Sequence, residues 1–260
     1  MISVSELFSV NDRFAVVTGG SRGIGLDMAS ALVAGGATVV ISSRKEQAVD
    51  AAVEELSKQG TAYGLAADLG TVAGAQALTD FVKTKTDKVD ILVNNAGATW
   101  GATLETFPED GWDKIMNVNL KGPFFLTQAM LPLLKAAASK AQPAKVINIA
   151  SVEGMRPGQM ETYSYGASKS GLIHLTEHLA LQLAPQNVTV NAIAPGPFAT
   201  KMMRGTIDMA GEDVIAGMVP LKRMGQPEDI HAMALYLGSQ ASNYVTGQTI
   251  ALGGGLGTIA

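Results

Sequence analysis

The sequence contains no cysteine, so disulfide bonds and thiolate metal sites are excluded. Histidine is also scarce, with three residues among 260. His174 and His178 lie four positions apart in an expected helix, a spacing that can bind zinc, but the glutamate that follows the first histidine in zinc proteases is missing. We therefore expect these two side chains to lie on a surface or interface, and we expect no metal site.

Charged residues and long apolar runs are limited as well. Charged residues make up 16% and hydrophobic residues 47%, which favours a folded core over disorder. A net charge of −4 gives no support for a nucleic-acid partner. No apolar run reaches the roughly 18 residues of a membrane-spanning helix, and the first residues do not resemble a secretory signal. We expect a cytoplasmic protein without membrane or nucleic-acid partners.

Short apolar runs rich in β-branched residues alternate with segments of helical periodicity, beginning near Gly23, Lys45, Val72, Asp110, Tyr163 and Pro227. Strands that are apolar on both faces and separated by helices indicate a parallel sheet covered on both sides. The sequence therefore predicts an α/β fold, a single-domain Rossmann fold over residues 1–260 with a seven-stranded parallel doubly wound sheet. The expected strands are Phe14–Thr18, Thr38–Ser42, Ala62–Ala66, Ile91–Val93, Lys145–Ile149, Val188–Ile193 and Thr249–Leu252.

Residues 198–222 interrupt this alternation. They carry four methionines, an unusual apolar density for a connection, and methionine adapts to irregular shapes. We expect a small helical cap that serves as a flexible lid over an apolar substrate.

A glycine-rich turn joins the first expected strand to the first expected helix. The turn reads Thr18-Gly19-Gly20-Ser21-Arg22-Gly23-Ile24-Gly25, and its spacing differs from the common G-x-G-x-x-G pattern. Between a strand and a helix, such a turn presents helix amide groups to an anion, so it predicts dinucleotide binding.

The second strand ends at Ser43 and Arg44, where NAD-binding folds carry an acidic residue for the adenosine ribose. A carboxylate would repel a 2′-phosphate, whereas a hydroxyl and a guanidinium attract it. Arg22 in the glycine turn supplies a second positive charge. The pattern favours NADP(H).

Tyr165 and Lys169 lie four positions apart in an expected helix and share one face. A cation one turn away lowers the pKa of a phenol by stabilising the phenolate. Ser151 follows the strand Lys145–Ile149 at the edge where ligands bind in such sheets, and its hydroxyl is able to donate to a substrate carbonyl.

Five ordered motifs, from about residue 12 to the C-terminus, resemble those of the short-chain dehydrogenases/reductases. They are Thr18-Gly19-x3-Gly23-Ile24-Gly25, Asn94-Asn95-Ala96-Gly97, Asn119, Ser151 with Tyr165-x3-Lys169, and Pro195-Gly196. Within the family, AMLPLLKAAAS, KVINIASVEG and APGPFATKM are most similar to the bacterial 3-oxoacyl reductases associated with rhamnolipid precursors. One departure is Gly253, at the place of an aspartate that usually begins an Asp-Gly-Gly, and it leaves the packing of the C-terminus open.

The resemblance implies that Tyr165 is the general acid in carbonyl reduction and the general base in alcohol oxidation. Lys169 would lower the pKa of Tyr165 and hold the nicotinamide ribose, Ser151 would orient the carbonyl, and Asn119 would keep a water in a proton relay with Lys169. The residues expected to contact NADP(H) are Gly19, Ser21, Arg22, Gly23, Ile24, Gly25, Ser43, Arg44, Asp68, Leu69, Asn95, Tyr165, Lys169, Pro195, Gly196, Phe198 and Thr200.

The expected substrate wall is mostly apolar and consists of Trp100, Val152, Met155, Tyr163 and Met202. It favours a hydrophobic ketone or a 3-oxoacyl thioester, with a hydroxysteroid or bulky aryl ketone as the alternative. A different class of function, an inactive NADP-binding protein that senses redox state, would not require all four catalytic positions to be filled as they are here. Surplus apolar residues on the helices 110–138 and 163–184, together with the family resemblance, predict a homotetramer.

Overall fold

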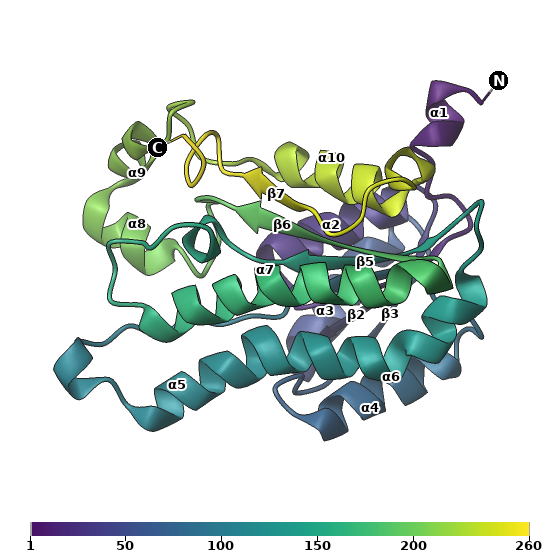
Figure 1. Cartoon of the computed structure of the whole chain (residues 1–260), viewed down its shortest axis with the longest axis horizontal. Coiled ribbons are helices and arrows are strands. Elements are labelled where there is room, and N and C mark those ends of the chain that lie inside the picture. Colours follow the sequence, from purple (N-terminus) through teal and green to yellow (C-terminus); the bar gives the residue numbers. More distant parts are fainter. Residues whose placement is uncertain (1, 260) are drawn as a thin grey trace.

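Seven parallel strands form one sheet in the order β3-β2-β1-β4-β5-β6-β7 (Figure 1). The structure, a computed structural model, describes residues 2–259. The sheet predicted from the sequence is confirmed, with strand ends that differ by at most two residues. The strands are β1 (Phe14–Thr18), β2 (Thr38–Ser43), β3 (Ala62–Ala66), β4 (Ile91–Asn94), β5 (Ala144–Ile149), β6 (Val188–Pro195) and β7 (Thr249–Leu252).

Helices cover both faces of the sheet, because the strands are apolar on both faces and would otherwise expose them. Two separate apolar cores result, one on each face. One face carries α2 (Gly23–Ala34), α3 (Glu46–Ser57) and α10 (Pro227–Gly238), and the other carries α4 (Val72–Lys83), α6 (Gly122–Ala137) and α7 (Tyr163–Leu183).

The strand order reverses between β1 and β4, because β1 pairs with β2 on one side and with β4 on the other. The connections that leave these two strands diverge, and a crevice opens beyond their carboxyl ends. Thr18 holds the two ends together, since its Oγ1 accepts from the amides of Asn95 and Ala96 at 2.9 Å each and donates to the carbonyl of Val93 at 3.2 Å.

The long helix expected over residues 110–138 is divided. It consists of α5 (Glu109–Met116), a π-helical turn at Asn117–Lys121 and α6. Pro123 has no amide hydrogen for an α-helical bond to the carbonyl of Asn119, and the amide of Gly122 instead bonds the carbonyl of Asn117. The π turn places the Asn119 side chain in the interior, where it is fully buried.

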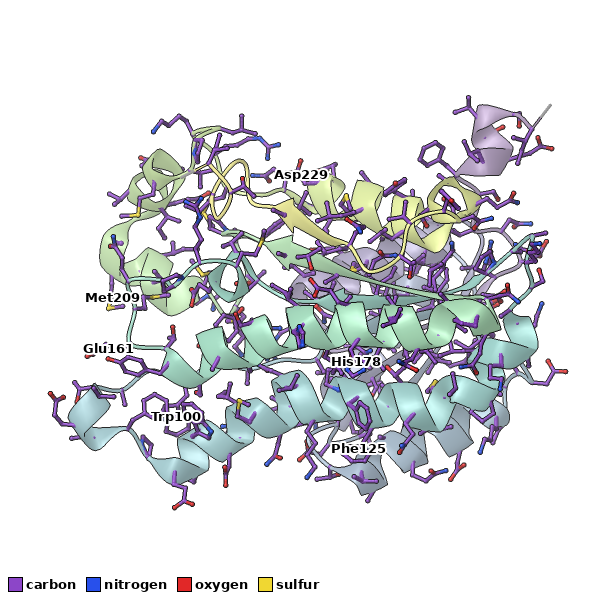
Figure 2. The ribbon with its side chains drawn as sticks, in the orientation of Figure 1. Trp100, Phe125, Glu161, His178, Met209 and Asp229 are labelled. Carbon is purple, nitrogen blue, oxygen red and sulfur yellow. The ribbon has the colours of Figure 1, made fainter. Side chains whose placement is uncertain are left out.

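The connection after β6 contains two short helices, α8 (Arg204–Ala210) and α9 (Glu212–Met218), so the helical cap predicted from the sequence is confirmed. Both stand beside the carboxyl edge of the sheet, on the same side as the C-terminus (Figure 1). Phe198, Ile215 and Val219 are buried, whereas Met209 is 84% exposed (Figure 2). A further short helix, α1 (Val4–Leu7), was not predicted, although Ser3 and Glu6 form the capping box that starts it.

The segment after β7 folds back over the turn that follows β5. Gly257, at φ +82°, packs so closely on Val152 that a Cβ there would lie 2.7 Å from the Val152 Cβ. Arg156 Nη2 donates to the carbonyl of Thr258 at 2.7 Å, which ties the chain end to the same turn. Among the described residues, no helix has the length and apolar character required to cross a membrane.

Charged side chains are buried at the opposite, amino-terminal edge of the sheet. Asp90 accepts a hydrogen bond from the amide of Phe14 at 2.9 Å and lies 3.9 Å from Arg13 Nη1. Lys145, 2% exposed, donates to Asn243 Oδ1 at 2.9 Å. Burial, and secondly the nearby Arg13 charge, lower the pKa of Lys145 to about 8.

We expect Lys145→Met to weaken the rise of stability with pH. The folded pKa, about 8, lies below the unfolded value of about 10.4, so between these values the unfolded chain binds more protons than the folded one. Stability from this group is therefore lowest below pH 8 and increases as the pH rises, by about 2 kcal/mol between pH 7 and pH 9.5.

Urea unfolding at these two pH values measures the effect. The increase in the free energy of unfolding should be about 2 kcal/mol smaller in Lys145→Met than in Lys140→Met, which changes an exposed lysine nearby. An equal increase in both variants would show that the Lys145 charge is not penalised by burial.

Candidate active site

The glycine turn lies at the crevice between β1 and β4 and leads into α2. Gly19 and Gly23 have positive φ angles of +65° and +52°, which favour glycine. A Cβ at Gly19 would lie 2.7 Å from the Asn95 side-chain nitrogen, and a Cβ at Gly25 would overlap the same atom. The turn therefore packs so closely against Asn95 that only glycine fits at positions 19 and 25. The first backbone amides of α2 are left directed into the crevice.

Asn95 fixes this turn to the end of β4. Its Nδ2 donates to the carbonyl of Thr18 at 2.8 Å and to that of Gly19 at 3.3 Å. Across the crevice, Thr200 approaches the turn, since a Cβ at Gly23 would lie 3.2 Å from its methyl group. The turn and the segment after β6 thus form two sides of one cleft.

The residues expected to bind adenosine lie at the ends of the neighbouring strands. Ser43 ends β2 and is half-buried, Arg44 follows it and is exposed, and Arg22 is exposed at the start of α2. Asp68 follows β3, and its Oδ1 accepts from the amide of Gly70 at 3.0 Å, while Leu69 is buried. Two guanidinium groups therefore flank the edge of the sheet where the sequence predicts the 2′-phosphate.

Pro195 ends β6, and the segment after it is held in place by backbone bonds. The amide of Gly196 donates to the carbonyl of Leu252 at 3.0 Å, and the amide of Gly225 donates to that of Pro197 at 2.9 Å. Phe198 is buried, with its ring packed on Gly225, and its carbonyl accepts from the amide of Thr200 at 2.7 Å. These contacts give the segment a fixed backbone opposite the glycine turn.

The departure at Gly253 has a structural reason. A Cβ at this position would lie 2.7 Å from the carbonyl oxygen of Leu256 and 2.9 Å from a methyl carbon of Val152. A side chain at position 253 would therefore displace the segment that folds back over Val152. Close packing of this C-terminal segment explains why glycine stands where the family usually has aspartate.

Ser151 lies directly after β5, at the start of the 3₁₀ turn Val152–Gly154 (η3). Its Oγ accepts from the amide of Glu153 at 3.2 Å, so its own hydroxyl hydrogen stays available to a substrate oxygen. The Ser151 side chain lowers the pKa of Tyr165, so these two hydroxyl groups lie close to each other.

Lys169 is one turn beyond Tyr165 on α7, and its Nζ lies 5.7 Å from the centroid of the tyrosine ring. The Nζ donates to the carbonyl of Ile149 at 2.6 Å, which leaves two of its three hydrogens for other partners. The side chain is buried, and this burial lowers the pKa of Lys169 to about 8. A cation that is costly to bury is thus placed between the tyrosine and the end of β5.

The pKa of Tyr165 is raised, chiefly by burial. The interaction with Ser151 is the next largest influence and lowers the pKa, and the negative charge of Glu153, a smaller influence, raises it. The net direction differs from the lowering predicted from Lys169 alone, because burial of the phenol outweighs the favourable interactions. In the chain by itself, Tyr165 is held in its protonated form.

Asn119 joins the chain after β4 to α7. Its Oδ1 accepts from the amide of Ala98 at 2.9 Å, and its Nδ2 donates to the carbonyl of Ala98 at 3.0 Å and to Ser168 Oγ at 3.0 Å. Ser168 Oγ in turn donates to the carbonyl of Tyr165 at 2.8 Å. The asparagine is thereby coupled to the backbone of the tyrosine, a contact that its sequence pattern did not predict.

The five expected substrate residues divide into two groups. Val152 is buried in the turn after β5. Met155, which follows this turn, is 38% exposed, and Met202, just before α8, is 48% exposed. Trp100 packs on Gly111, and Lys114 Nζ lies 5.2 Å over its ring. The Tyr163 ring packs edge-on against Phe107, with the two ring centroids 5.8 Å apart. Trp100 and Tyr163 therefore pack against residues in α5 or just before it.

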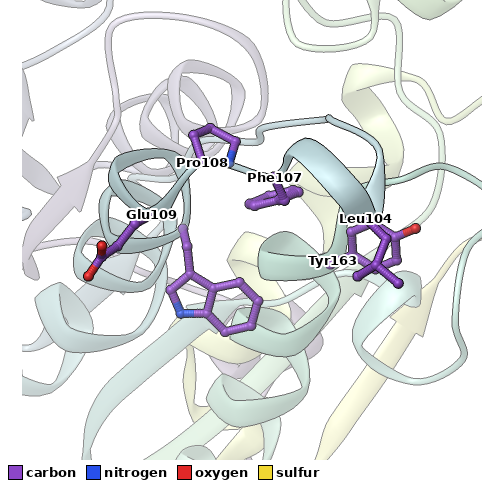
Figure 3. Close-up of a pocket in the computed structure, with 6 residues that line it drawn as sticks. Leu104, Phe107, Pro108, Glu109 and Tyr163 are labelled. Atoms are coloured by element: carbon purple, nitrogen blue, oxygen red, sulfur yellow. The ribbon is translucent and has the colours of Figure 1, made fainter.

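An apolar pocket of about 300 Å³ lies beside Tyr163 but does not include Trp100 (Figure 3). Because Tyr163 is two residues before Tyr165, the two rings leave α7 in different directions. The pocket is lined by Leu104, Phe107, Pro108, Glu109, Trp112 and Tyr163.

Two neighbours of the reacting groups were missed by sequence analysis. The carbonyl of Ile149 binds Lys169, and a backbone acceptor has no sequence signal. Glu153 was overlooked although it stands two residues after Ser151, where an acidic residue close to an expected catalytic serine is itself a signal.

Comparisons with known proteins agree with this geometry. A family model described as enoyl-(acyl carrier protein) reductase matches residues 19–257. The rhamnolipids biosynthesis 3-oxoacyl-[acyl-carrier-protein] reductase of Pseudomonas aeruginosa is 41% identical over 249 residues, which cover 95% of this chain and 97% of that protein.

Solved structures are similar over nearly the whole chain. The Pseudomonas aeruginosa RhlG/NADP active-site complex superposes with a TM-score of 0.94 at 40% identity, covering 97% of this chain and 99% of that one. A gluconate 5-dehydrogenase from Burkholderia cenocepacia in complex with NADP and tartrate superposes with a TM-score of 0.91 at 32% identity, covering 99% and 100%. The chain therefore belongs to the short-chain dehydrogenase/reductase family.

Proposed function

We propose that this protein is an NADP(H)-dependent oxidoreductase that transfers hydride between the cofactor and a carbonyl or secondary alcohol. The observation that carries the proposal is the convergence of Ser151, Tyr165 and Lys169 at the carboxyl edge of the sheet, beside the glycine turn. The relatives described above are reductases and dehydrogenases, and two of the solved structures contain NADP. An inactive redox sensor is not favoured, because it would have no use for a buried lysine beside a half-buried tyrosine.

The cleft fits NADP(H). Any side chain at Gly19 or Gly25 would fill the space beside Asn95, so the turn keeps room for a pyrophosphate at the start of α2. Arg44 and Arg22 would hold the 2′-phosphate, with Ser43 beside them, and Asp68 and Leu69 would contact the adenine. Ser21 and Ile24 would line the turn, and Pro195, Gly196, Phe198 and Thr200 would hold the carboxamide.

In carbonyl reduction, bound NADPH supplies the hydride. The Tyr165 hydroxyl, held protonated by burial, donates its proton to the carbonyl oxygen. Ser151 donates a hydrogen bond to the same oxygen and so stabilises its developing negative charge. The Lys169 ammonium stabilises the phenolate that remains, and its two free hydrogens are available to the cofactor ribose and to a water. Through Ser168, Asn119 orients the backbone of Tyr165, the residue that must regain a proton after each reduction.

A hydrophobic ketone or a 3-oxoacyl thioester is the substrate class that we propose. The relative with 41% identity is a 3-oxoacyl-[acyl-carrier-protein] reductase, and the wall beside Ser151 includes Val152 and Met155. We further propose that residues 198–222 act as the substrate lid, because Met209 and Met218 leave apolar surface exposed on this segment. The cytoplasmic location expected from the sequence stays a prediction.

We also propose a homotetramer. Phe124 is exposed and Phe125 and Leu175 are half-buried on α6 and α7, and Phe125 marks this outward apolar face in Figure 2. Leu131 and Leu179, which the sequence also suggested, pack partly against the core beneath. Leu172 and Leu183, which the sequence also suggested for this face, are buried toward the sheet. Pairing of this face with its copy around a two-fold axis would remove the exposed apolar surface from water.

Tyr165→Phe tests the reaction directly. The change removes the proton donor and keeps the ring, so turnover should fall by at least about 10²-fold while NADPH affinity stays within about threefold. NADPH oxidation with hydrophobic ketones and a 3-oxoacyl thioester, followed by absorbance, measures turnover, and fluorescence titration measures affinity. Tyr163→Phe is the matched control, because its hydroxyl is two residues away and its ring lies on Phe107. Turnover of Tyr165→Phe within tenfold of the wild type would mean that another group is the acid.

Arg44→Asp should shift cofactor preference toward NAD(H). Loss of one charge-assisted contact to the 2′-phosphate should reduce NADPH affinity by one to two decades, or about 1.5–3 kcal/mol. Lys45→Asp, at the next exposed position, controls for the change in overall charge. A wild-type protein that already prefers NADH would contradict the argument from Ser43 and Arg44.

Light scattering at micromolar concentration tests the assembly. The wild type should have the mass of a tetramer, and Phe125→Asp should dissociate it, because a carboxylate would be buried in the apolar face. Val72→Asp makes a similar change on an exposed residue of α4 and should leave the mass unchanged. A stable and fully active wild-type monomer would be incompatible with the proposal.

A further inference from the structure

Glu153 is the acidic residue nearest in sequence to the reacting hydroxyl groups and has no part in the mechanism above. It lies in η3, two residues after Ser151, and its amide donates to Ser151 Oγ. The turn is held firmly on α7, since Ser170 Oγ donates to the carbonyl of Gly154 at 2.7 Å, and a Cβ at Gly154 would lie 2.7 Å from the backbone of Lys169. The position of Glu153 is therefore fixed relative to both Ser151 and α7.

The carboxylate of Glu153 is half-buried and has little to compensate its charge. Its Oε2 accepts from Thr162 Oγ1 at 3.1 Å, and Gly158 packs against it, with a Cβ there lying 3.1 Å from the carboxyl carbon. Within residues 2–259, no lysine, arginine or histidine nitrogen lies within 4.0 Å of it. A carboxylate that is half-buried and lacks an ion pair destabilises the fold, as the raised pKa of Glu153 indicates.

The two cations in the same region are engaged elsewhere. Arg156 is exposed, and its Nη2 is bound to the carbonyl of Thr258. Lys169 Nζ is bound to the carbonyl of Ile149. Neither cation forms an ion pair with Glu153, and its negative charge contributes to the raised pKa of Tyr165.

A substrate whose carbonyl oxygen meets Ser151 and Tyr165 lies beside the turn that carries Glu153. Neutral ketones and thioesters are not repelled, but a carboxylate one or two bonds from the carbonyl is. At about 7 Å in a partly hydrated site, two unit negative charges repel enough to change an equilibrium constant roughly tenfold.

We propose that Glu153 determines specificity by charge: its unpaired carboxylate disfavours substrates that carry an anion beside the reacting carbonyl and so selects neutral ketones. The inference rests on the proposed function and narrows it. It bears on a real alternative within the family, because the gluconate 5-dehydrogenase described above was solved with tartrate, which carries two carboxylates.

The test compares two ketones that differ in charge, acetoacetate and its ethyl ester, with saturating NADPH at pH 8. The measured quantity is the ratio of kcat/KM for the anion to kcat/KM for the ester. Glu153→Gln keeps the shape and removes the charge, so it should raise this ratio about tenfold, mainly through a lower KM for acetoacetate. A ratio cancels any general loss of activity caused by altered packing.

Two matched variants separate charge from shape. Glu153→Asp keeps the charge and should leave the ratio within about twofold of the wild type, and Glu161→Gln removes an exposed carboxylate from the same connection and should do likewise (Figure 2). An unchanged ratio in Glu153→Gln, with wild-type reduction of the ester intact, would overturn the inference and leave the proposed function standing. A wild-type protein that reduced neither these two ketones nor any member of the ketone panel would overturn both.

Discussion

The close packing of α7 on the end of β5 is the contact on which the active site depends. Lys169 reaches the carbonyl of Ile149, and Ser170 binds that of Gly154. Further along α7, Thr176 Oγ1 accepts from Asn148 Nδ2 at 2.8 Å. Asn148 also accepts from Asn94 on β4 at 2.9 Å, so the contact extends across the sheet. Because Lys169, Thr176, Asn148 and Asn94 are buried, a shift of α7 by one residue would leave several of these groups unpaired, and this cost keeps Tyr165 opposite Ser151.

Most of the fold was predictable because its signals are local. Seven apolar runs bounded by turns indicate strands, and their separation by helices leaves little alternative to a parallel sheet. The division of the helix around Asn119 was not predicted, although Pro123 marks it, because a proline near a helix start is equally compatible with a new helix and with a changed turn. The short helix at Val4–Leu7 was missed because four residues are too few to show a period.

For the site, the sequence predicted which side chains meet but not the balance of forces among them. Spacing placed Tyr165 and Lys169 on one face, the position after a strand indicated Ser151, and the family resemblance added Asn119. The direction of the tyrosine pKa is set chiefly by burial, which is a property of the tertiary structure. Likewise, Trp100 and Tyr163 were assigned to the substrate wall by proximity in sequence, whereas their contacts with Gly111 and Phe107 follow from the path of the chain after β4.

The segment that folds back over Val152 has a practical consequence for anyone who handles this protein. Its last described residues are bound to Arg156 and packed on the turn that carries Glu153, while α1 lies at the far end of the molecule (Figure 1). An affinity tag fused after residue 260 would pull on the wall of the substrate site, whereas a tag before α1 would lie far from it. Kinetic constants measured with the two kinds of fusion are therefore not interchangeable, and the amino-terminal fusion is the appropriate one for comparing substrates.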